Sequence, residues 1–380
     1  MRSEHPAASE HFVADFSDDV DTETDTQHST VSSGSATTTR SWLGYAVRRV
    51  AKSMVTLFLV VSAAFFLVRY MPGDPVQAAI AELMQTEGLS YSEAALRAAS
   101  LVSYDPSAPL GLQYLQYLAN LAHGDLGTSI TSPGTPVSQL VTVSLGWTVF
   151  SVGTGTIIAF VLGIALGIWI AYRRGGIADH VVTNVSAFLH AVPNYVWALL
   201  TLIIFGVQLE IIDITALQGT HDPGTHPSFT LAFALNALKH AALPILLYVF
   251  TTVGGWILTM KASTLQVLDE DFVTVAHVRG LPRPRILVQY VGRNAILPLF
   301  TSFALAMGNV VGGSILIETI FSYNGVGYYL YDAIIHRDYP VMQGFILVMT
   351  IAVIVANLIA DLLLSRIDPR IQVSGGSRAS

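Results

Sequence analysis

Six apolar runs dominate the sequence and restrict what the chain can fold into. Each is about as long as the roughly twenty residues that a helix needs to cross the hydrocarbon core of a bilayer. The runs cover residues 50–70, 144–171, 185–209, 234–260, 295–317 and 341–364. With 52% hydrophobic and 12% charged residues, the composition is that of a membrane protein rather than a soluble domain. We therefore expect an all-α integral membrane protein with six transmembrane helices.

Two further features of the runs bear on their packing and chemistry. The second run contains Gly153, Gly155, Gly163 and Gly167, at spacings that allow another helix to approach closely. The first run is too long for a cleavable signal peptide and lacks a small-residue cleavage site, so we expect it to remain as a span. The absence of cysteine excludes disulfides and thiolate metal sites.

The distribution of Lys and Arg indicates the orientation of the spans. With a cytosolic N-terminus and alternating spans, fifteen of the nineteen basic residues lie inside, and Arg69, Arg97, Lys239 and Arg337 lie outside. Both termini are therefore expected to be cytosolic. Impermeant thiol reagents should then label cysteines introduced at Ser129 and Ser228 from outside, and cysteines at Ser263 or Ser365 after permeabilisation.

The chain divides into five predicted regions. Residues 1–40 form an acidic cytosolic tail that is expected to be disordered, because residues 1–39 hold eight acids and one base and few large apolar groups. Residues 41–71 comprise an interfacial helix, with Arg48 and Arg49 near Trp42, followed by the first span. Residues 72–143 form an extracytoplasmic segment, 144–366 the transmembrane core, and 367–380 a cytosolic tail.

The extracytoplasmic segment is predicted to be a small helical cap. Residues 94–101 and 114–121 read as short helices, and prolines at positions 106, 109, 133 and 136 as breaks. Asp125 and Thr128 are placed to cap helix ends or turns. A loop of this length is usually either functional or disordered, and the leucine spacing favours a packed structure.

A charged stretch between the fourth and fifth runs predicts a helix–turn–helix elbow (residues 269–285). Acidic residues from Asp269 to Asp271 open a short helix, and His277 and Arg279 close it, which matches the polarity of the helix dipole. Gly280 stands where a C-terminal cap is expected, and Pro282 can only follow a helix end or begin the next helix. Such an elbow would transmit force from a soluble partner to the membrane helices.

This stretch resembles the coupling element of bacterial and archaeal ABC importer permeases. The general Glu-Ala-Ala pattern is replaced here by Thr274-Val275-Ala276, and the agreement is with the dipeptide/oligopeptide branch. The matching residues are Asp271, Phe272, Val273, Ala276, Arg279, Gly280, Leu281, Arg293, Asn294, Ala295 and Pro298. The blocks at 71–75, 124–129, 312–327, 337–344 and 368–370 also resemble this family and occur in its order, so the resemblance covers residues 42–371.

The resemblance implies the first, B-type permease subunit of a type I ABC importer in a prokaryotic inner or plasma membrane. Its partners would be a homologous second permease, two ATPase subunits and an extracytoplasmic binding protein, with no nucleic acid involved. Bound cofactors are expected on the ATPases, as ATP and Mg, and none on this chain. In the coupling loop (262–294) the expected ATPase-coupling residues are Asp271, Phe272, Val273, Ala276, His277, Arg279, Gly280, Leu281 and Pro282. Of these, Phe272 and Leu281 are expected to be anchors in the ATPase, while Asp271 and Arg279 hold the shape of the elbow. On the binding-protein side the expected residues are Asp125, Thr128, Arg337, Asp338 and Tyr339.

The alternatives belong to other classes of membrane protein. The sequence has no Gly-x-x-x-x-Gly-Lys-Ser/Thr phosphate loop and no catalytic motif, so an enzyme has no residues to support it. An ion-coupled carrier or channel stays possible, although ionisable residues are scarce at mid-span: Arg69, Glu318 and Asp361 lie toward span ends, where snorkelling suffices. His190 is expected near the inner surface. Peptide is the favoured substrate, with oligosaccharides, nickel complexes and glutathione open.

Overall fold

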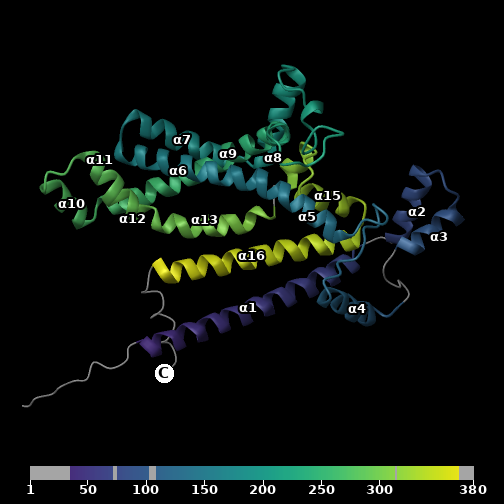
Figure 1. Ribbon diagram of the computed structural model, residues 1–380. Helices are drawn as coiled ribbons and strands as arrows, with labels where there is room; N and C mark the ends of the chain where they lie inside the picture. Colours follow the sequence, from purple (N-terminus) through teal and green to yellow (C-terminus); the bar gives the residue numbers. More distant parts are fainter. Residues whose placement is uncertain (1–34, 72–74, 102–107, 313–314, 368–380) are drawn as a thin grey trace, which may run out of the picture. The chain divides into compact units, whose positions relative to one another are not determined.

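Helices make up the regular structure of the part of the chain that is described. The computed structural model describes residues 35–71, 75–101, 108–312 and 315–367, so most of the predicted acidic tail and residues 368–380 lie outside it. Residues 1–48 and 49–380 are separate units. The longer elements are α1 (Ser35–Arg69), α2 (Pro75–Thr86), α3 (Tyr91–Leu101), α4 (Leu110–Ala122), α5 (Val137–Thr148), α6 (Thr154–Tyr172), α7 (Ile177–Ala191), α8 (Asn194–Thr201), α9 (Leu231–Leu268), α10 (Asp271–Val278), α13 (Leu297–Val310), α15 (Val326–Ile335) and α16 (Tyr339–Ile367) (Figure 1). Shorter helical pieces are η1 (Val149–Gly153), η2 (Leu202–Gln208), η3 (Thr215–Leu217), α11 (Arg283–Arg285), η4 (Ile286–Gly292), α12 (Arg293–Ala295) and α14 (Ile315–Ile320). The predicted all-α class is confirmed.

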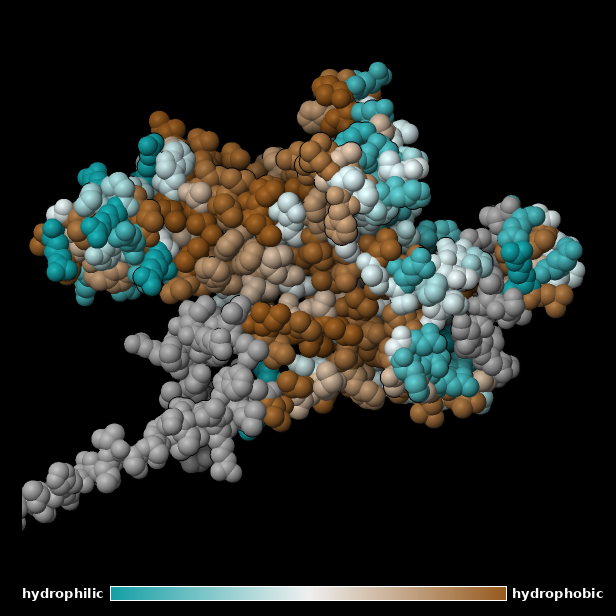
Figure 2. Space-filling view, viewed as in Figure 1, coloured by the Kyte–Doolittle hydropathy of each residue, from teal (hydrophilic) through white to brown (hydrophobic). Residues whose placement is uncertain are grey.

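Four helices in the described ranges are long and apolar enough to cross a membrane. They are Val47–Arg69, Val137–Tyr172, Leu231–Leu268 and Tyr339–Ile359, and they coincide with the first, second, fourth and sixth predicted spans. The fifth predicted span contains the shorter apolar helix Leu297–Val310. Figure 2 shows hydrophobic side chains over much of the visible surface of this helical region, whereas hydrophilic ones gather around α10 and α11 and also around α2, α3 and α4. The count of six spans remains a prediction.

The third predicted span is not a single straight helix. It consists of Ile177–Ala191 and Asn194–Gln208, which are bent by 93° at a short break. Val192 is extended there, with φ −85° and ψ 128°, and Pro193 precedes the first residue of α8. A residue before proline is driven out of the helical region by steric clash with the ring, so the sequence itself places the break.

Helix boundaries differ from the predicted region boundaries at two places. α1 begins at Ser35 and continues without a break to Arg69, so the predicted interfacial helix and the first span share one helix. α5 begins at Val137, directly after Pro136, and therefore the second long helix reaches into the segment that was assigned to the extracytoplasmic region. The helices predicted at 94–101 and 114–121 are present within α3 and α4, and α2 was missed.

Glycines allow α6 and α9 to lie against each other along their length (Figure 1). A Cβ atom at Gly167 would stand 2.6 Å from the Cβ atom of Met260, and one at Gly163 would collide with Trp256. Gly155 is similarly close to Tyr248, at 3.1 Å, whereas Gly153 has ordinary spacing. The predicted close approach is thus confirmed for three of the four glycines, and a larger residue at Gly163 or Gly167 would push the helices apart.

An apolar core joins the C-terminal end of α1 to α5, α15 and the start of α16. Buried apolar residues from all four elements meet there, among them Val68, Val141, Leu330 and Phe345. This core lies near the predicted extracytoplasmic blocks around residues 125–129 and 337–341. It therefore fixes the backbone on which those blocks are carried.

Candidate functional site

The elbow is closed by backbone hydrogen bonds at the C-terminal end of α10. The Gly280 N–H donates to the His277 carbonyl at 2.9 Å, and the Leu281 N–H donates to the Ala276 carbonyl at 3.3 Å. This pair of bonds is the Schellman arrangement, which needs a residue with left-handed backbone dihedral angles directly after the helix C-cap. Gly280 supplies it, with φ +70°. The predicted glycine cap is confirmed.

The two faces of α10 have different surroundings. Val273 and Ala276 are buried against Ile286 and Val291 of η4, together with partly buried residues of α9, the elbow and η4 (Val267, Leu268, Leu281 and Tyr290). The opposite face bears three apolar side chains that the chain itself leaves exposed: Phe272 at 39%, Val275 at 54% and Val278 at 84%. Residues three apart lie on one side of a helix, so these three form a continuous stripe, here called the α10 stripe.

The polar residues of the elbow contribute less to its shape than the sequence suggested. Asp271 and Arg279 are exposed, and neither makes a side-chain hydrogen bond or ion pair with another residue of the described ranges. The His277 ring contacts the Val273 carbonyl at 2.9 Å within its own helix. The buried apolar face and the Schellman bonds hold the elbow, and of the two expected anchors Leu281 packs partly into this core.

The elbow is joined firmly to two long helices. The elbow follows α9 directly. The exposed Pro282 precedes α11, and from α11 the chain continues through η4 and α12 into α13. The Ser263 hydroxyl of α9 donates to the Ala295 carbonyl of α12 at 2.7 Å. The π-helical geometry of η4 is rare and is often found at functional sites. These links connect α10 to both α9 and α13.

Far from the elbow in the sequence, Asp338 joins two of the predicted blocks. Its buried carboxylate accepts hydrogen bonds from the Ser129 hydroxyl at 2.5 Å, the Ile130 N–H at 2.9 Å, and the N–H and hydroxyl of Thr131 at 3.1 and 3.0 Å. The other carboxylate oxygen accepts from the Val341 N–H at 3.3 Å. This Asp338 cluster connects segments about two hundred residues apart. Its donors surround the buried carboxylate with hydrogen bonds, which a charged group needs when it is removed from water.

The other residues predicted on this side shape the backbone around the Asp338 cluster. Asp125 accepts from the Gly127 N–H at 2.8 Å, which confirms its turn role, and Thr128 forms an isolated β-bridge with Pro136. Arg337 holds a left-handed conformation, φ 59°, at the end of α15, and Tyr339 is buried. Because Asp338 and Tyr339 are buried within the chain, their side chains offer almost no surface to a partner.

Glu318 is a buried carboxylate that the sequence reasoning misplaced. It is 1% exposed rather than snorkelling, and it accepts from the Thr148 hydroxyl at 2.9 Å and from the N–H groups of Gly327 and Tyr328 at 2.7 and 3.3 Å. Those two N–H groups belong to the first turn of α15, so Glu318 caps that helix. A Cβ atom at Gly325 would stand 2.5 Å from the Glu318 carboxylate, so only glycine leaves room for the carboxylate there. The Gly-x-Gly pattern that follows Glu318 is therefore the sequence feature that could have indicated this contact.

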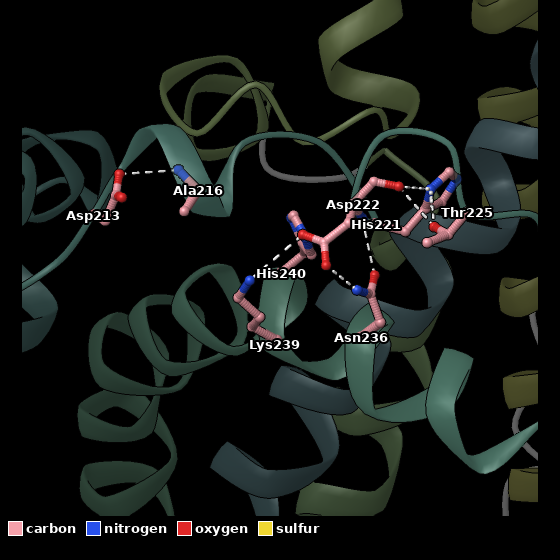
Figure 3. A network of polar contacts seen from close by, with 8 residues as sticks. All are labelled: Asp213, Ala216, His221, Asp222, Thr225, Asn236, Lys239 and His240. Carbon is pink, nitrogen blue, oxygen red and sulfur yellow. Dashed lines mark hydrogen bonds and ion pairs between the residues drawn. The ribbon is translucent and has the colours of Figure 1, made fainter.

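A third polar cluster, which the sequence did not reveal, ties the segment 209–230 to α9 (Figure 3). The Asp222 carboxylate contacts His240 Nε2 at 3.0 Å and Lys239 Nζ at 3.5 Å, and it accepts a hydrogen bond from the Asn236 amide. The Asp222 N–H donates to Asn236 at 2.9 Å. The hydrogen bonds from His240 and Asn236, with nearby Lys239, hold the pKa of Asp222 below its ordinary value.

Comparison with known proteins decides the family. Residues 163–373 match the family described as binding-protein-dependent transport system inner membrane component. The chain belongs to this family. The matched region contains the elbow, Glu318 and Asp338, whereas Asp125 and Thr128 lie before it. In the described ranges no group of three or more His, Cys, Asp or Glu side chains is arranged to hold a metal ion.

Three named relatives extend the similarity to nearly their whole length. The oligopeptide transport system permease protein AppB of Bacillus subtilis is 30% identical over 86% of this chain and 99% of its own. The di/tripeptide transport system permease protein DppB of Pseudomonas aeruginosa is 32% identical over 87% of this chain and 99% of its own. The dipeptide transport system permease protein DppB of Escherichia coli K12 is 30% identical over 87% and 99%.

Proposed function

We propose that this chain is the transmembrane permease subunit of an ATP-driven importer. It forms half of a translocation pathway with a homologous second permease, while two ATPase subunits drive the cycle and an extracytoplasmic binding protein delivers the ligand. ATP-driven closure of the ATPases moves the elbow as a rigid body, and the spans switch between inward-open and outward-open states.

The observation that carries this proposal is the α10 stripe. An apolar stripe flanked by acidic and basic residues, on a helix fixed by a Schellman cap and a buried opposite face, suits docking of an amphipathic helix into a groove. The sequence has no phosphate loop of its own, so the partner in that groove supplies nucleotide hydrolysis. Phe272 and Val278, rather than Leu281, are the anchors that we assign to it.

Peptides are the proposed cargo. The three relatives bear names of oligopeptide, di/tripeptide and dipeptide permeases, and each is matched over nearly its whole length. Selection among cargoes would rest largely on the binding protein. Oligosaccharides, nickel complexes or glutathione are the alternatives within the same machinery.

The proposed orientation puts the elbow in the cytosol and the Asp338 cluster outside. Basic residues support it: Arg279, Arg283, Arg285 and Arg293 cluster on the elbow side. Ser129 and Ser263 are unsuited to cysteine labelling, because both are buried and hydrogen-bonded. Ser228 is exposed and is kept, and exposed Thr274 replaces Ser263: Ser228→Cys should react with an impermeant thiol reagent on intact cells, and Thr274→Cys after permeabilisation. Labelling of Thr274→Cys from outside would overturn the orientation.

On the outer side, α2 and α3 would form part of the binding-protein contact. The two helices pack through a small core of Ile80, Leu83, Ala94 and Ala98. An ion pair between Arg97 and Glu87 at 2.6 Å closes the hairpin. Such a core supports the prediction of a packed cap at this segment rather than a linker.

An ion-coupled carrier is the alternative from another class. Such a carrier needs a carboxylate or histidine relay that exchanges ions, and Glu318 is the buried carboxylate nearest to that description. Its carboxylate is held by Thr148 and two backbone N–H groups at a helix start. That arrangement suits a fixed cap better than a relay.

The test is uptake by the reconstituted complex. In proteoliposomes that hold both permeases, both ATPases and the binding protein, uptake should require ATP and should not follow an ion gradient alone. Val278→Asp should lower uptake by roughly tenfold or more, because it replaces an apolar anchor of the α10 stripe with a charge. Ile177→Asp, at an apolar residue at the start of α7 that is 84% exposed like Val278, is the matched control. Ion-driven uptake without ATP would contradict the proposal.

A further inference from the structure

A pocket lined by both apolar and polar side chains lies at the break between α7 and α8. Its volume is about 590 Å³, and it is bounded by the break, one face of α9 and the start of α13. Gly255 of α9 lines it beside the His190 ring, and Gly254 lets α7 lie close to α9, because a Cβ atom there would collide with the Ser186 carbonyl oxygen. The polar side chains that line it are His190, Asn194, Thr251, Thr252, Thr259 and Ser302.

The pocket lies within the bilayer-spanning length of α9. Lys239 and Lys261 bound a stretch without Asp, Glu, Lys or Arg, and at the helical rise they stand about 33 Å apart, close to the roughly 30 Å of a hydrocarbon core. Thr251 is then about 15 Å from the level of Lys261, and Thr259 about 3 Å. On this scale the pocket extends from mid-membrane to the side of the elbow, with His190 beside Gly255.

Exposing an unsatisfied polar group to lipid at this depth costs free energy. Over its span α1 exposes mainly apolar side chains, of which Val55, Phe58 and Leu59 are all more than half exposed, and the exposed Thr56 hydroxyl donates to the Lys52 carbonyl. The pocket instead gathers hydroxyl, amide and imidazole groups at a backbone break, and non-helical backbone at membrane depth is tolerated where it is buried or lines a water-filled cavity. This concentration of polar groups at the break suits an aqueous path better than a lipid-facing surface.

The chemistry of the lining indicates what it can bind. The Thr252 and Thr259 hydroxyls donate to carbonyls of their own helix at 2.7 and 2.8 Å, as does Thr251 at 3.1 Å. With their protons so engaged, the hydroxyl oxygens remain as hydrogen-bond acceptors. No Asp, Glu, Lys or Arg lines the pocket, so nothing there discriminates between acidic and basic side chains.

We propose that this pocket holds the backbone of the transported peptide during passage, with the hydroxyl oxygens of Thr252 and Thr259 accepting from its amide and ammonium N–H groups. The inference rests on the proposed function and adds a site within the membrane. His190, at the rim of the pocket, offers both a donor and an acceptor to the same backbone. A path that reads only the backbone admits peptides of any side-chain charge.

The native chain has no cysteine, which makes a single-cysteine test clean. In the complete transporter, Thr252→Cys should react with a charged methanethiosulfonate reagent, because thiolates form only where water reaches. The reaction should abolish uptake of alanyl-alanine and should be slowed by that dipeptide during ATP-driven turnover. Phe58→Cys, on the exposed apolar face of α1, should stay unmodified in the same membranes.

A second variant tests the ligand class without relying on thiol chemistry. Thr252→Val keeps the side-chain shape and removes the acceptor, so uptake of alanyl-alanine, alanyl-aspartate and alanyl-lysine should each fall by roughly fivefold. A loss confined to one charge type would overturn the proposal.

The outcomes also separate this inference from the proposed function. If Thr252→Cys stays unreactive in every nucleotide state, or reacts while uptake continues unchanged, the pocket is covered by a partner or unused, and the inference is overturned. ATP-driven uptake by the unmodified complex would still stand in that case. If the unmodified complex showed no ATP-driven uptake, the proposed function itself would be contradicted.

Discussion

The elbow and the Asp338 cluster are both compact, yet they are held by opposite means. In the elbow, residues within about twenty-five positions of one another supply the buried face, and the backbone supplies the cap. In the Asp338 cluster, one carboxylate bonds a loop about two hundred residues earlier in the chain. The elbow leaves an apolar stripe exposed, whereas the Asp338 cluster leaves almost no side-chain surface exposed.

This difference separates a surface that suits a partner, as proposed for the α10 stripe, from a joint within the chain. An exposed apolar stripe on a rigid support gains from being covered by another protein. A buried, saturated carboxylate gains nothing from a partner, since its donors are already satisfied. Substitutions should therefore affect the two regions in different ways: assembly at the elbow and stability at the cluster.

The largest effect is expected from Asp338→Ala. It leaves at least four donors without their acceptor in a buried site, which should lower the free energy of unfolding by about 3 kcal/mol. The measurement is thermal denaturation of the purified complex in detergent. Asp332→Asn, at a half-exposed carboxylate of α15, is the control and should shift the midpoint little. Equal shifts for the two variants would remove the distinction between joint and surface.

An intermediate effect is expected from Gly280→Val. The site has free space for a side chain, so the cost comes from the left-handed backbone and amounts to about 1–2 kcal/mol. Membrane insertion should persist while transport and ligand-stimulated ATP hydrolysis are lost, because α10 and η4 are misaligned. Gly280→Asn should retain most activity, since asparagine tolerates this conformation. Normal transport by Gly280→Val would mean that the cap does not set the elbow.

The smallest effect is expected at Asp222, where the carboxylate is partly exposed. Its folded-state pKa is lowered, so its contribution is present above the unfolded pKa of about 3.9 and is lost as the pH falls through the folded value. Segment 209–230 should therefore loosen only in strong acid. Amide hydrogen exchange of that segment would measure it, and Asp222→Asn should abolish the acid dependence. Loosening between pH 7 and 5 would point to a different group.

Sequence reasoning found the elbow because its determinants are local. The acidic start, Gly280 and the two prolines that follow each specify a backbone conformation within one or two turns. The bend at Pro193 is equally local, since a proline there is expected to kink or start a helix, although the apolar run across it was read as one span. Hydrophobic length alone does not distinguish a straight helix from a broken one.

The joints escaped prediction for a different reason. No periodicity connects Asp338 with Ser129, Glu318 with Thr148, or Asp222 with His240, since each pairing depends on how distant helices fold together. The family-like blocks marked some of these residues, yet they suggested surface contacts where the structure shows burial. Exposure, which separates Val278 from Leu281, is likewise a property of the folded chain.

The most direct test of the central claim is a site-specific photocrosslink in the complete transporter. Benzoylphenylalanine introduced in place of Val278 should crosslink to an ATPase subunit, and in place of Leu96 it should not, with the products identified by mass spectrometry. Both positions carry highly exposed apolar side chains, so exposure alone does not separate them. Crosslinking of the Val278 position to an ATPase, and its loss in Gly280→Val, is the result that we expect. Crosslinking of that position to lipid alone, or to the binding protein, would contradict the assignment of the α10 stripe as the docking surface.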